Sequence, residues 1–186
     1  MREGFPPRTR DPKTIRSMLS ALGSVLGPGS ALYVSSPITS GRRFLEATDS
    51  KASRSALVAQ NLRSSGQVVE RLRSENPGSI IYAAGMEDIP GWEQDDYRSF
   101  WGAVIERFAV RAVFLDDWEF SNGCSYEFLV CSRNGIPCED QEHGELSIEA
   151  GARSIAEAAS LLRCKGADAG FLECVLGELS KLKVAS

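Results

Sequence analysis

The stretch Phe114-Leu-Asp-Asp-Trp-Glu-Phe-Ser-Asn-Gly-Cys-Ser-Tyr-Glu127 decides the fold, because it joins the end of a buried strand to the start of a helix. Apolar residues 113–115 lead directly into Asp116 and Asp117, which is typical of a strand that is covered on both faces and ends at the edge of a sheet. Residues 121–123, Ser-Asn-Gly, favour a helix N-terminus whose free N–H groups point outward. Open α/β sheets usually hold ligands at the carboxyl ends of their strands, so the sequence predicts a ligand site here.

Length and charge limit the class of protein. The chain has 186 residues, which is enough for one α/β domain with a sizeable core and too few for two. Its formal net charge is −4 and it has no run of Lys or Arg. We therefore expect a small-molecule partner, and neither a nucleic acid polymer nor a membrane. No segment is long and apolar enough to span a bilayer, and a signal peptide is not expected.

The cysteines and the histidine indicate no metal site. The five cysteines lack the paired close spacing of zinc or thioredoxin motifs. Reduced thiols in a cytoplasmic protein are the simplest interpretation. The only histidine, His143, lies in an acidic loop, so neither a metal site nor a histidine-dependent triad is predicted. No cofactor is expected.

The N-terminal region is predicted to be an addition to the domain. Residues 1–12 are polar without a regular hydrophobic period, and we expect a mobile tail there. From about Thr14, apolar residues follow helical spacing as far as the stop Gly27-Pro28-Gly29. This pattern predicts an amphipathic helix that lies against a single α/β domain spanning residues 13–186.

Strands and helices alternate along the rest of the chain. Predicted strands cover about residues 31–36, 79–84, 111–116 and 136–138, and predicted helices cover about 53–75, 97–108, 121–134, 147–165 and 169–182. Ser65-Gly66 is a candidate kink in the first of these helices. Strands separated by helices imply βαβ units with right-handed crossovers. We therefore predict an α/β fold, a three-layer α/β/α sandwich with a mostly parallel, flavodoxin-like sheet of four to five strands and two C-terminal helices.

Three polar clusters follow the predicted strand ends, at residues 39–43, 93–96 and 116–127. If the strand ends are neighbours, these clusters meet. Two carboxylates beside an anion-binding loop are suited to breaking a glycosidic bond. One attacks the anomeric carbon or stabilises the oxocarbenium ion, while the other orients a sugar hydroxyl or manages the proton.

Three motifs occur in a telling order: Tyr33-Val-Ser-Ser-Pro-Ile-Thr-Ser-Gly-Arg42, then Glu93-Gln-Asp95 opening an aromatic-rich helix, then Ser121-Asn-Gly-Cys-Ser-Tyr-Glu127. This order resembles the nucleoside 2-deoxyribosyltransferase-like superfamily, and most of all its deoxynucleoside 5′-monophosphate N-glycosidases. The similarity covers about residues 31–140. It rests on the order and spacing of the motifs together rather than on any one of them.

The resemblance implies a role for several residues. Glu127 would be the nucleophile that attacks C1′ and releases the base, and Asp95 would contact the sugar and assist proton transfer, unless the neighbouring Asp96 is the one that points inward. Ser121 matches a position that binds the 5′-phosphate. The expected substrate-binding residues are Tyr33, Thr39, Gly41, Arg42, Trp92, Asp96, Asp116, Ser121, Asn122 and Gly123. A nucleoside or nucleotide substrate, a homodimer and a reaction without a metal are implied in the same way.

The chain also departs from the pattern of that family. Thr39 stands where the monophosphate enzymes tend to have arginine, so phosphate recognition would fall to Arg42, Arg43 or helix N–H groups. Cys124 and Ser125 replace smaller or apolar residues.

Structural interpretations stay open beside the catalytic ones. Glu127 would then be a surface glutamate, and Asp95 and Asp96 would supply charge to a helix N-terminus. Trp92 and Trp118 lie in loops, where they could stack on a base. A non-catalytic nucleotide-binding module of the same fold is the alternative to an enzyme.

Overall fold

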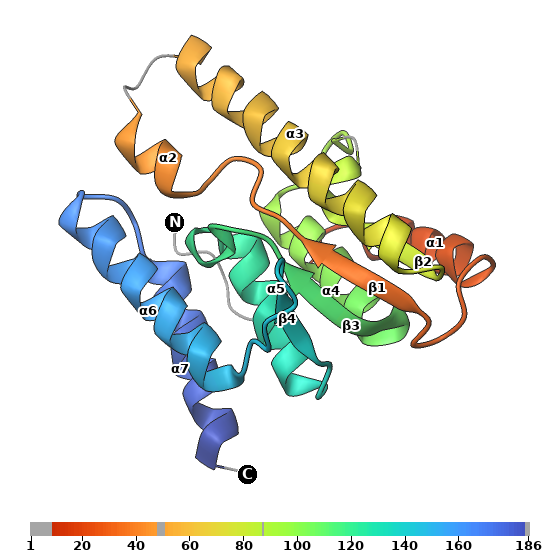
Figure 1. The fold of residues 1–186 in the computed structure, drawn as a ribbon. Helices are drawn as coiled ribbons and strands as arrows, with labels where there is room; N and C mark the ends of the chain where they lie inside the picture. Colours follow the sequence, from red (N-terminus) through yellow and green to blue (C-terminus); the bar gives the residue numbers. More distant parts are fainter. Residues whose placement is uncertain (1–8, 48–50, 87, 185–186) are drawn as a thin grey trace.

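The computed structural model describes residues 9–47, 51–86 and 88–184. Its strands form one all-parallel sheet in the order β2-β1-β3-β4, with helices on both faces (Figure 1). The strands are β1 (Ala31–Ser35), β2 (Ser79–Tyr82), β3 (Ala109–Phe114) and β4 (Cys138–Asp140). The predicted α/β/α sandwich with a flavodoxin-like sheet is confirmed, and the sheet has four strands.

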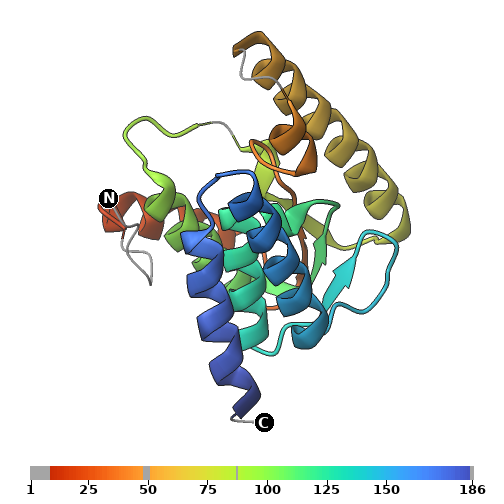
Figure 2. The same ribbon diagram turned by 90° about the vertical axis from the view of Figure 1, so that its left-hand side faces the viewer.

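The helices form a layer on each face of the sheet. They are α1 (Pro12–Gly23), α2 (Arg42–Glu46), α3 (Lys51–Glu75), α4 (Gln94–Phe108), α5 (Asn122–Arg133), α6 (Ile148–Cys164) and α7 (Gly170–Val184), and two 3-10 turns are η1 (Ala83–Gly85) and η2 (Trp118–Phe120). One face is covered by α3, whose N-terminal half extends past the strands toward α2 (Figure 1). The other face is covered by α1, α4 and α5, with α6 and α7 packed beside α5 (Figure 2).

Strand β1 shows why the sheet lies between two cores. All of its residues are buried, and successive side chains point to opposite faces. Tyr33 joins the large core under α4 and α5, which includes Phe100 and Phe128. Leu32 and Val34 join a smaller core under α3. The register pairs Ser35 with Phe114, so the carboxyl ends of β1 and β3 lie side by side.

Several helix ends follow the predicted signals. Ser121 caps α5, because its Oγ accepts a hydrogen bond from Cys124 N at 3.3 Å. After α5, Gly135 adopts a left-handed φ of 64°, which is common at the end of a helix. At the start of α1, Asp11 Oδ1 accepts from Thr14 N at 3.2 Å and Pro12 occupies the first turn.

Some boundaries differ from the prediction. Helix α1 ends at Gly23, with Ser24 as its C-cap residue, before the predicted stop. The short helix α2 was not predicted. The segment 51–75 is one uninterrupted helix, and at the predicted kink Ser65 Oγ bonds back to Asn61 O at 2.9 Å without breaking it. Strand β4 lies two residues later than expected.

The described part of the predicted tail is anchored rather than mobile. Thr9 Oγ1 and Arg10 N each donate to Asp96 Oδ1 at 2.7 Å. Arg10 also pairs with Glu93 at 2.8 Å. Residues 9–11 therefore belong to the folded domain and hold its N-terminus against the start of α4, while residues 1–8 of the predicted tail lie outside the described residues.

All five cysteines are free thiols: Cys124, Cys131 and Cys138 are buried, and Cys164 and Cys174 are exposed. No helix in the described part of the chain has the length and apolar character needed to cross a bilayer.

Candidate functional site

The carboxyl ends of β1 and β3 form the candidate site. The chain leaves β1 toward β2 on one side of the sheet, whereas β3 lies on the other side, so the order of strands reverses direction between β1 and β3. Open α/β sheets bind ligands at such a point. Helix α5 follows β3 through η2 and brings its second turn against β1.

Glu127 lies in this second turn of α5 and is only 7% exposed. Its Oε2 accepts a hydrogen bond from Ser35 Oγ at 2.6 Å, across 92 positions of sequence. Ser35 is the last residue of β1 and is fully buried, so its hydroxyl has a fixed direction. Glu127 is therefore an oriented, buried carboxyl group, and the alternative of a surface helix glutamate is wrong.

The surroundings of Glu127 raise its pKa to about 7. Burial is the cause, and the hydrogen bond from Ser35 and the Tyr33 hydroxyl partly oppose it. The Tyr33 hydroxyl is buried and has no hydrogen-bond partner among the described residues. Burial and the charge of Glu127 raise the pKa of Tyr33 well above its ordinary value. Glu127 thus changes charge near neutral pH, in a setting without a neighbouring cation that would hold it ionised.

The surroundings of the Cys124 thiol oppose its ionisation. Burial above all, and then the charge of Glu127, raise the pKa of Cys124 to about 12. A nucleophilic cysteine needs a depressed pKa, so cysteine chemistry at this position has no support.

Asp95 does not meet Glu127. Its Oδ1 accepts from Arg98 Nη2 at 2.7 Å and from Arg98 Nε at 3.3 Å. The Arg98 guanidinium, in turn, lies over the ring of Phe171 in α7, 4.5 Å from its centroid. Only burial, Ser35 and Tyr33 shift the pKa of Glu127, and Asp95 is not among these influences. The structure therefore pairs Asp95 with Arg98, and among the described residues it shows no interaction between Asp95 and Glu127.

Asp96 is buried, but its contacts are structural. It is 1% exposed, and its oxygens accept from Thr9 Oγ1, Arg10 N and, at 2.9 Å, Glu93 N. Burial opposes its ionisation, but these hydrogen bonds outweigh burial and hold the pKa of Asp96 below its ordinary value.

Trp92 is likewise engaged in packing. Its Nε1 donates to Asp11 Oδ2 at 3.3 Å. Its ring centroid lies 5.1 Å from that of Tyr97 and 5.6 Å from that of Phe100, both in edge contacts. Trp118, the other candidate for base stacking, is buried between Phe114 and Phe128.

The loop after β1 is locked to the turn after β3. Gly41 has a φ of 119°, and a Cβ at this position would lie 3.0 Å from Asp117 Oδ2, so only glycine fits. The same Oδ2 accepts from Arg42 N at 2.8 Å. The Arg42 guanidinium lies 3.9 Å from Asp117 Oδ1 and over the ring of Phe120. Gly41 and Arg42 thus join the two strand ends.

The remaining predicted residues lie around the contact between the loop after β1 and the turn after β3. Thr39 and Asn122 are exposed, and Gly123 is half-buried. Asp116 Oδ2 accepts from Gln141 Nε2 at 2.7 Å. Ser121 is occupied as the cap of α5. No bound molecule is needed to explain their present contacts.

The described residues line two cavities at this edge of the sheet. The α3-side cavity, about 410 Å³, lies between α3 and the ends of β1 and β3. The η2-side cavity, about 470 Å³, is lined by η2 and α2 and includes Glu119, whose pKa is raised chiefly by burial. Arg43, Asp116 and Asp117 line both cavities, and Glu127 lines neither. Among residues 9–47, 51–86 and 88–184, no three His, Cys, Asp or Glu side chains are placed to hold a metal ion.

Sequence reasoning missed one functional candidate at this edge and left a second one undecided. Ser35, which orients Glu127, could have been found as a hydroxyl at the end of an apolar strand, on the same face as Tyr33. The sequence offered Arg42 and Arg43 alike for phosphate recognition; in the structure Arg43 lines both cavities, whereas Arg42 lines the η2-side cavity alone. No local pattern distinguishes two adjacent arginines, because their directions depend on Asp117.

Comparison of the chain with models of known protein families, with curated proteins and with solved structures finds no match. The resemblance drawn from the order of the motifs therefore stays a prediction.

Proposed function

We propose that the protein is an N-glycosidase or deoxyribosyltransferase-like enzyme of the cytoplasm, which cleaves the N-glycosidic bond of a nucleoside or nucleoside 5′-monophosphate. One observation carries the proposal. Glu127 is a buried carboxyl group at the carboxyl edge of the sheet, oriented by Ser35 and titrating near neutral pH. Perturbed and oriented carboxyl groups of this kind are typical of active sites.

The proposed chemistry uses Glu127 as the nucleophile. An ionised Oε attacks C1′, the bond from C1′ to the base nitrogen breaks, and its electron pair leaves with the base, which is then protonated. Water releases the covalent sugar in hydrolysis, and a second base releases it in transfer. The proposal gives Asp95 no proton to transfer, because Asp95 is paired with Arg98. Ser35 would keep Glu127 facing the sugar.

The test is release of free base from a panel of nucleosides and nucleoside 5′-monophosphates, followed by chromatography. We expect wild type to release base from at least one substrate, and Glu127→Gln to lower this rate at least about a thousandfold, as removal of a nucleophile does. Glu157→Gln is the matched control, because Glu157 is an exposed glutamate of α6. If wild type and Glu127→Gln release base at the same background rate on every substrate, the proposal fails.

A non-catalytic nucleotide-binding module of the same fold is the second candidate. It is favoured by the contacts of Asp95 and Asp96, which leave Glu127 without a second carboxylate. The two candidates differ in a thermal melt. A binding module is stabilised by its nucleotide without forming product.

A homodimer belongs to the same proposal, since it follows from the resemblance alone. Analytical ultracentrifugation checks it, and a strict monomer at all concentrations would count against it.

A further inference from the structure

The α3-side cavity is separate from Glu127. Ser36 and Pro37 form one wall of this cavity, and Leu115 and Asp116 form another. The preceding residue Ser35 directs its hydroxyl toward Glu127 on the α5 side. Successive residues of an extended chain point to opposite faces, so the cavity and Glu127 lie on opposite sides of the β1 end.

The wall made by the loop after β1 is held in place by α3. Asn61 Nδ2 donates to Ile38 O at 3.2 Å and to Ser40 O at 3.1 Å. One turn later, Ser65 Oγ lies in hydrogen-bond contact with Tyr82 Oη at the end of β2. These contacts fix both the loop and the helix around the cavity.

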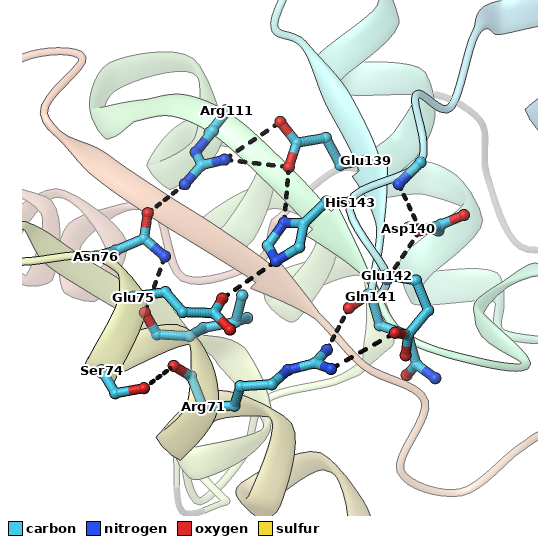
Figure 3. Close-up of polar contacts among 12 residues, drawn as sticks. Arg71, Ser74, Glu75, Asn76, Arg111, Glu139, Asp140, Gln141, Glu142 and His143 are labelled. Atoms are coloured by element: carbon cyan, nitrogen blue, oxygen red, sulfur yellow. Dashed lines mark hydrogen bonds and ion pairs between the residues drawn. The ribbon is translucent and has the colours of Figure 1, made fainter.

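The opposite wall is held by the polar contacts in Figure 3. Arg71 of α3 donates to the backbone oxygen of Gln141, and its Nη1 lies 3.6 Å from Glu142. Gln141 itself donates to Asp116 at 2.7 Å. His143, in the same loop, lies between Glu75 at 3.1 Å and Glu139 at 3.5 Å. The end of α3 is thereby tied to the loop after β4, which gives the cavity a preformed shape.

Several polar side chains of the cavity are without a partner among the described residues. Ser36 is half-buried, whereas Arg43, Ser64 and Gln67 are exposed at the cavity mouth, and no side-chain hydrogen bond or ion pair joins any of the four to another described residue. The contrast with Arg42 is direct, because Arg42 is held by Asp117 and Phe120. A preformed pocket with convergent polar groups is a typical small-molecule site. A volume of about 410 Å³ falls within the range of pockets that hold small molecules.

We propose that the α3-side cavity binds a small phosphorylated sugar, with Arg43 at the phosphate and Ser36, Ser64 and Gln67 at the sugar hydroxyls. The charges favour one phosphate rather than a polyanion. Asp117 pairs with Arg42, and Asp116 accepts from the neutral amide of Gln141, so neither carboxylate forms an ion pair with Arg43. Arg43 and Arg71 bring positive charge to the cavity. Hydroxyl and amide groups both donate and accept, which suits a polyol. Val68 and Leu115 offer an apolar floor for the sugar carbons. This site goes beyond the proposed glycosidase function and does not depend on it.

Isothermal titration calorimetry of the full chain tests the site, with ribose 5-phosphate as the probe. We expect saturable binding, tighter than that of ribose or of inorganic phosphate alone. Arg43→Gln should weaken it about tenfold or more, because a charge-assisted contact is lost. Gln67→Ala should weaken it less. Arg63→Gln is the matched control, since Arg63 is an exposed arginine of α3 outside the cavity.

Three results would overturn this inference. The first is that wild type shows no saturable binding of ribose 5-phosphate. The second is that Arg43→Gln binds ribose 5-phosphate as tightly as Arg63→Gln does. The third is that inorganic phosphate alone binds to wild type as tightly as the sugar phosphate does. Glu127→Gln separates this site from the proposed active site. Binding should be unchanged in that variant even if the enzyme activity proves absent, and its loss would place the ligand at Glu127 and contradict a separate site.

Discussion

Two buried carboxyl groups of this chain have opposite electrostatic settings. Asp96 is 1% exposed and Glu127 is 7% exposed, so both have lost most of their contact with water. Asp96 accepts hydrogen bonds from Thr9, Arg10 and Glu93, and its pKa lies below the ordinary value. Glu127 accepts one from Ser35, and its pKa rises to about 7. The number of donors, rather than burial, decides which group stays ionised.

The comparison separates a structural carboxylate from a reactive one. Asp96 has its oxygens occupied and holds the N-terminal residues on α4. Glu127 retains capacity for a ligand and can exist in either protonation state near neutral pH. A buried carboxyl group that adds little to the stability of the fold, or lowers it, is a better candidate for a functional residue than a buried carboxyl group that the fold requires.

Removing Asp96 should have the largest effect. In Asp96→Ala, the backbone N–H groups of Arg10 and Glu93 lose their acceptor, and we expect the free energy of unfolding to fall by about 3 kcal/mol at pH 7. Urea denaturation measures this change. Asp88→Ala, at an exposed position, should change it by less than about 0.5 kcal/mol. A loss below about 1 kcal/mol in Asp96→Ala would contradict the structural role.

Neutralising Glu127 should raise the free energy of unfolding at neutral and alkaline pH, whereas removing Asp96 should lower it. Its pKa is about 7 in the folded chain against an ordinary value of 4.5, so the folded state favours the protonated form. Wild type should therefore lose roughly 2–3 kcal/mol of stability as pH rises from 4.5 through 7, and Glu127→Gln should not.

The measurement for this prediction is urea denaturation of both proteins at pH 5 and pH 8. Glu127→Gln should be the more stable protein at pH 8, while the difference shrinks at pH 5. Glu157→Gln controls for loss of an exposed glutamate. If wild type and Glu127→Gln differ in stability by the same amount at pH 5 and pH 8, burial does not raise the pKa of Glu127.

Removing the hydroxyl groups near Glu127 should have the smallest effect. Ser35→Ala should move the pKa of Glu127 further upward by roughly one unit, because Ser35 favours the ionised form. Tyr33→Phe should move it upward by less, since Tyr33 makes the weaker contribution. Carbon-13 NMR of labelled glutamate side chains, assigned with Glu127→Gln, gives both titrations. A larger shift in Tyr33→Phe than in Ser35→Ala would reverse this order.

Most of the fold was predictable because each element carries its own pattern. Fully covered parallel strands appear as short apolar runs, and the helices between them show a 3.6-residue period. The five-residue helix α2 has too few residues for a period, so it was missed. The end of α1 was misplaced because the last apolar residues, Val25 and Leu26, continue the pattern beyond the helix.

The site was less predictable because it depends on contacts between distant segments. The position of Glu127 at the edge of the sheet followed from the motifs, but its burial depends on β1, 92 positions away. Asp95 illustrates a signal that was readable, since its spacing to Arg98 is the one that pairs charges on a helix. The anchoring of Asp96 by Thr9 and Arg10 had no sequence signal, because residues 9–11 have no period.

The position of β1 in the sheet also matters during synthesis of the chain. β1 is made first, yet it is buried between β2 and β3, which are made later. At ribosomal speeds of about 5–20 residues per second, residues 36–108 take roughly 4–15 s to appear. Throughout that time this strand, which is fully buried in the folded chain, has at most one of its two neighbours. Translation rate and chaperone contact over residues 36–108 therefore bear on the yield of folded protein more than the same factors do later in the chain.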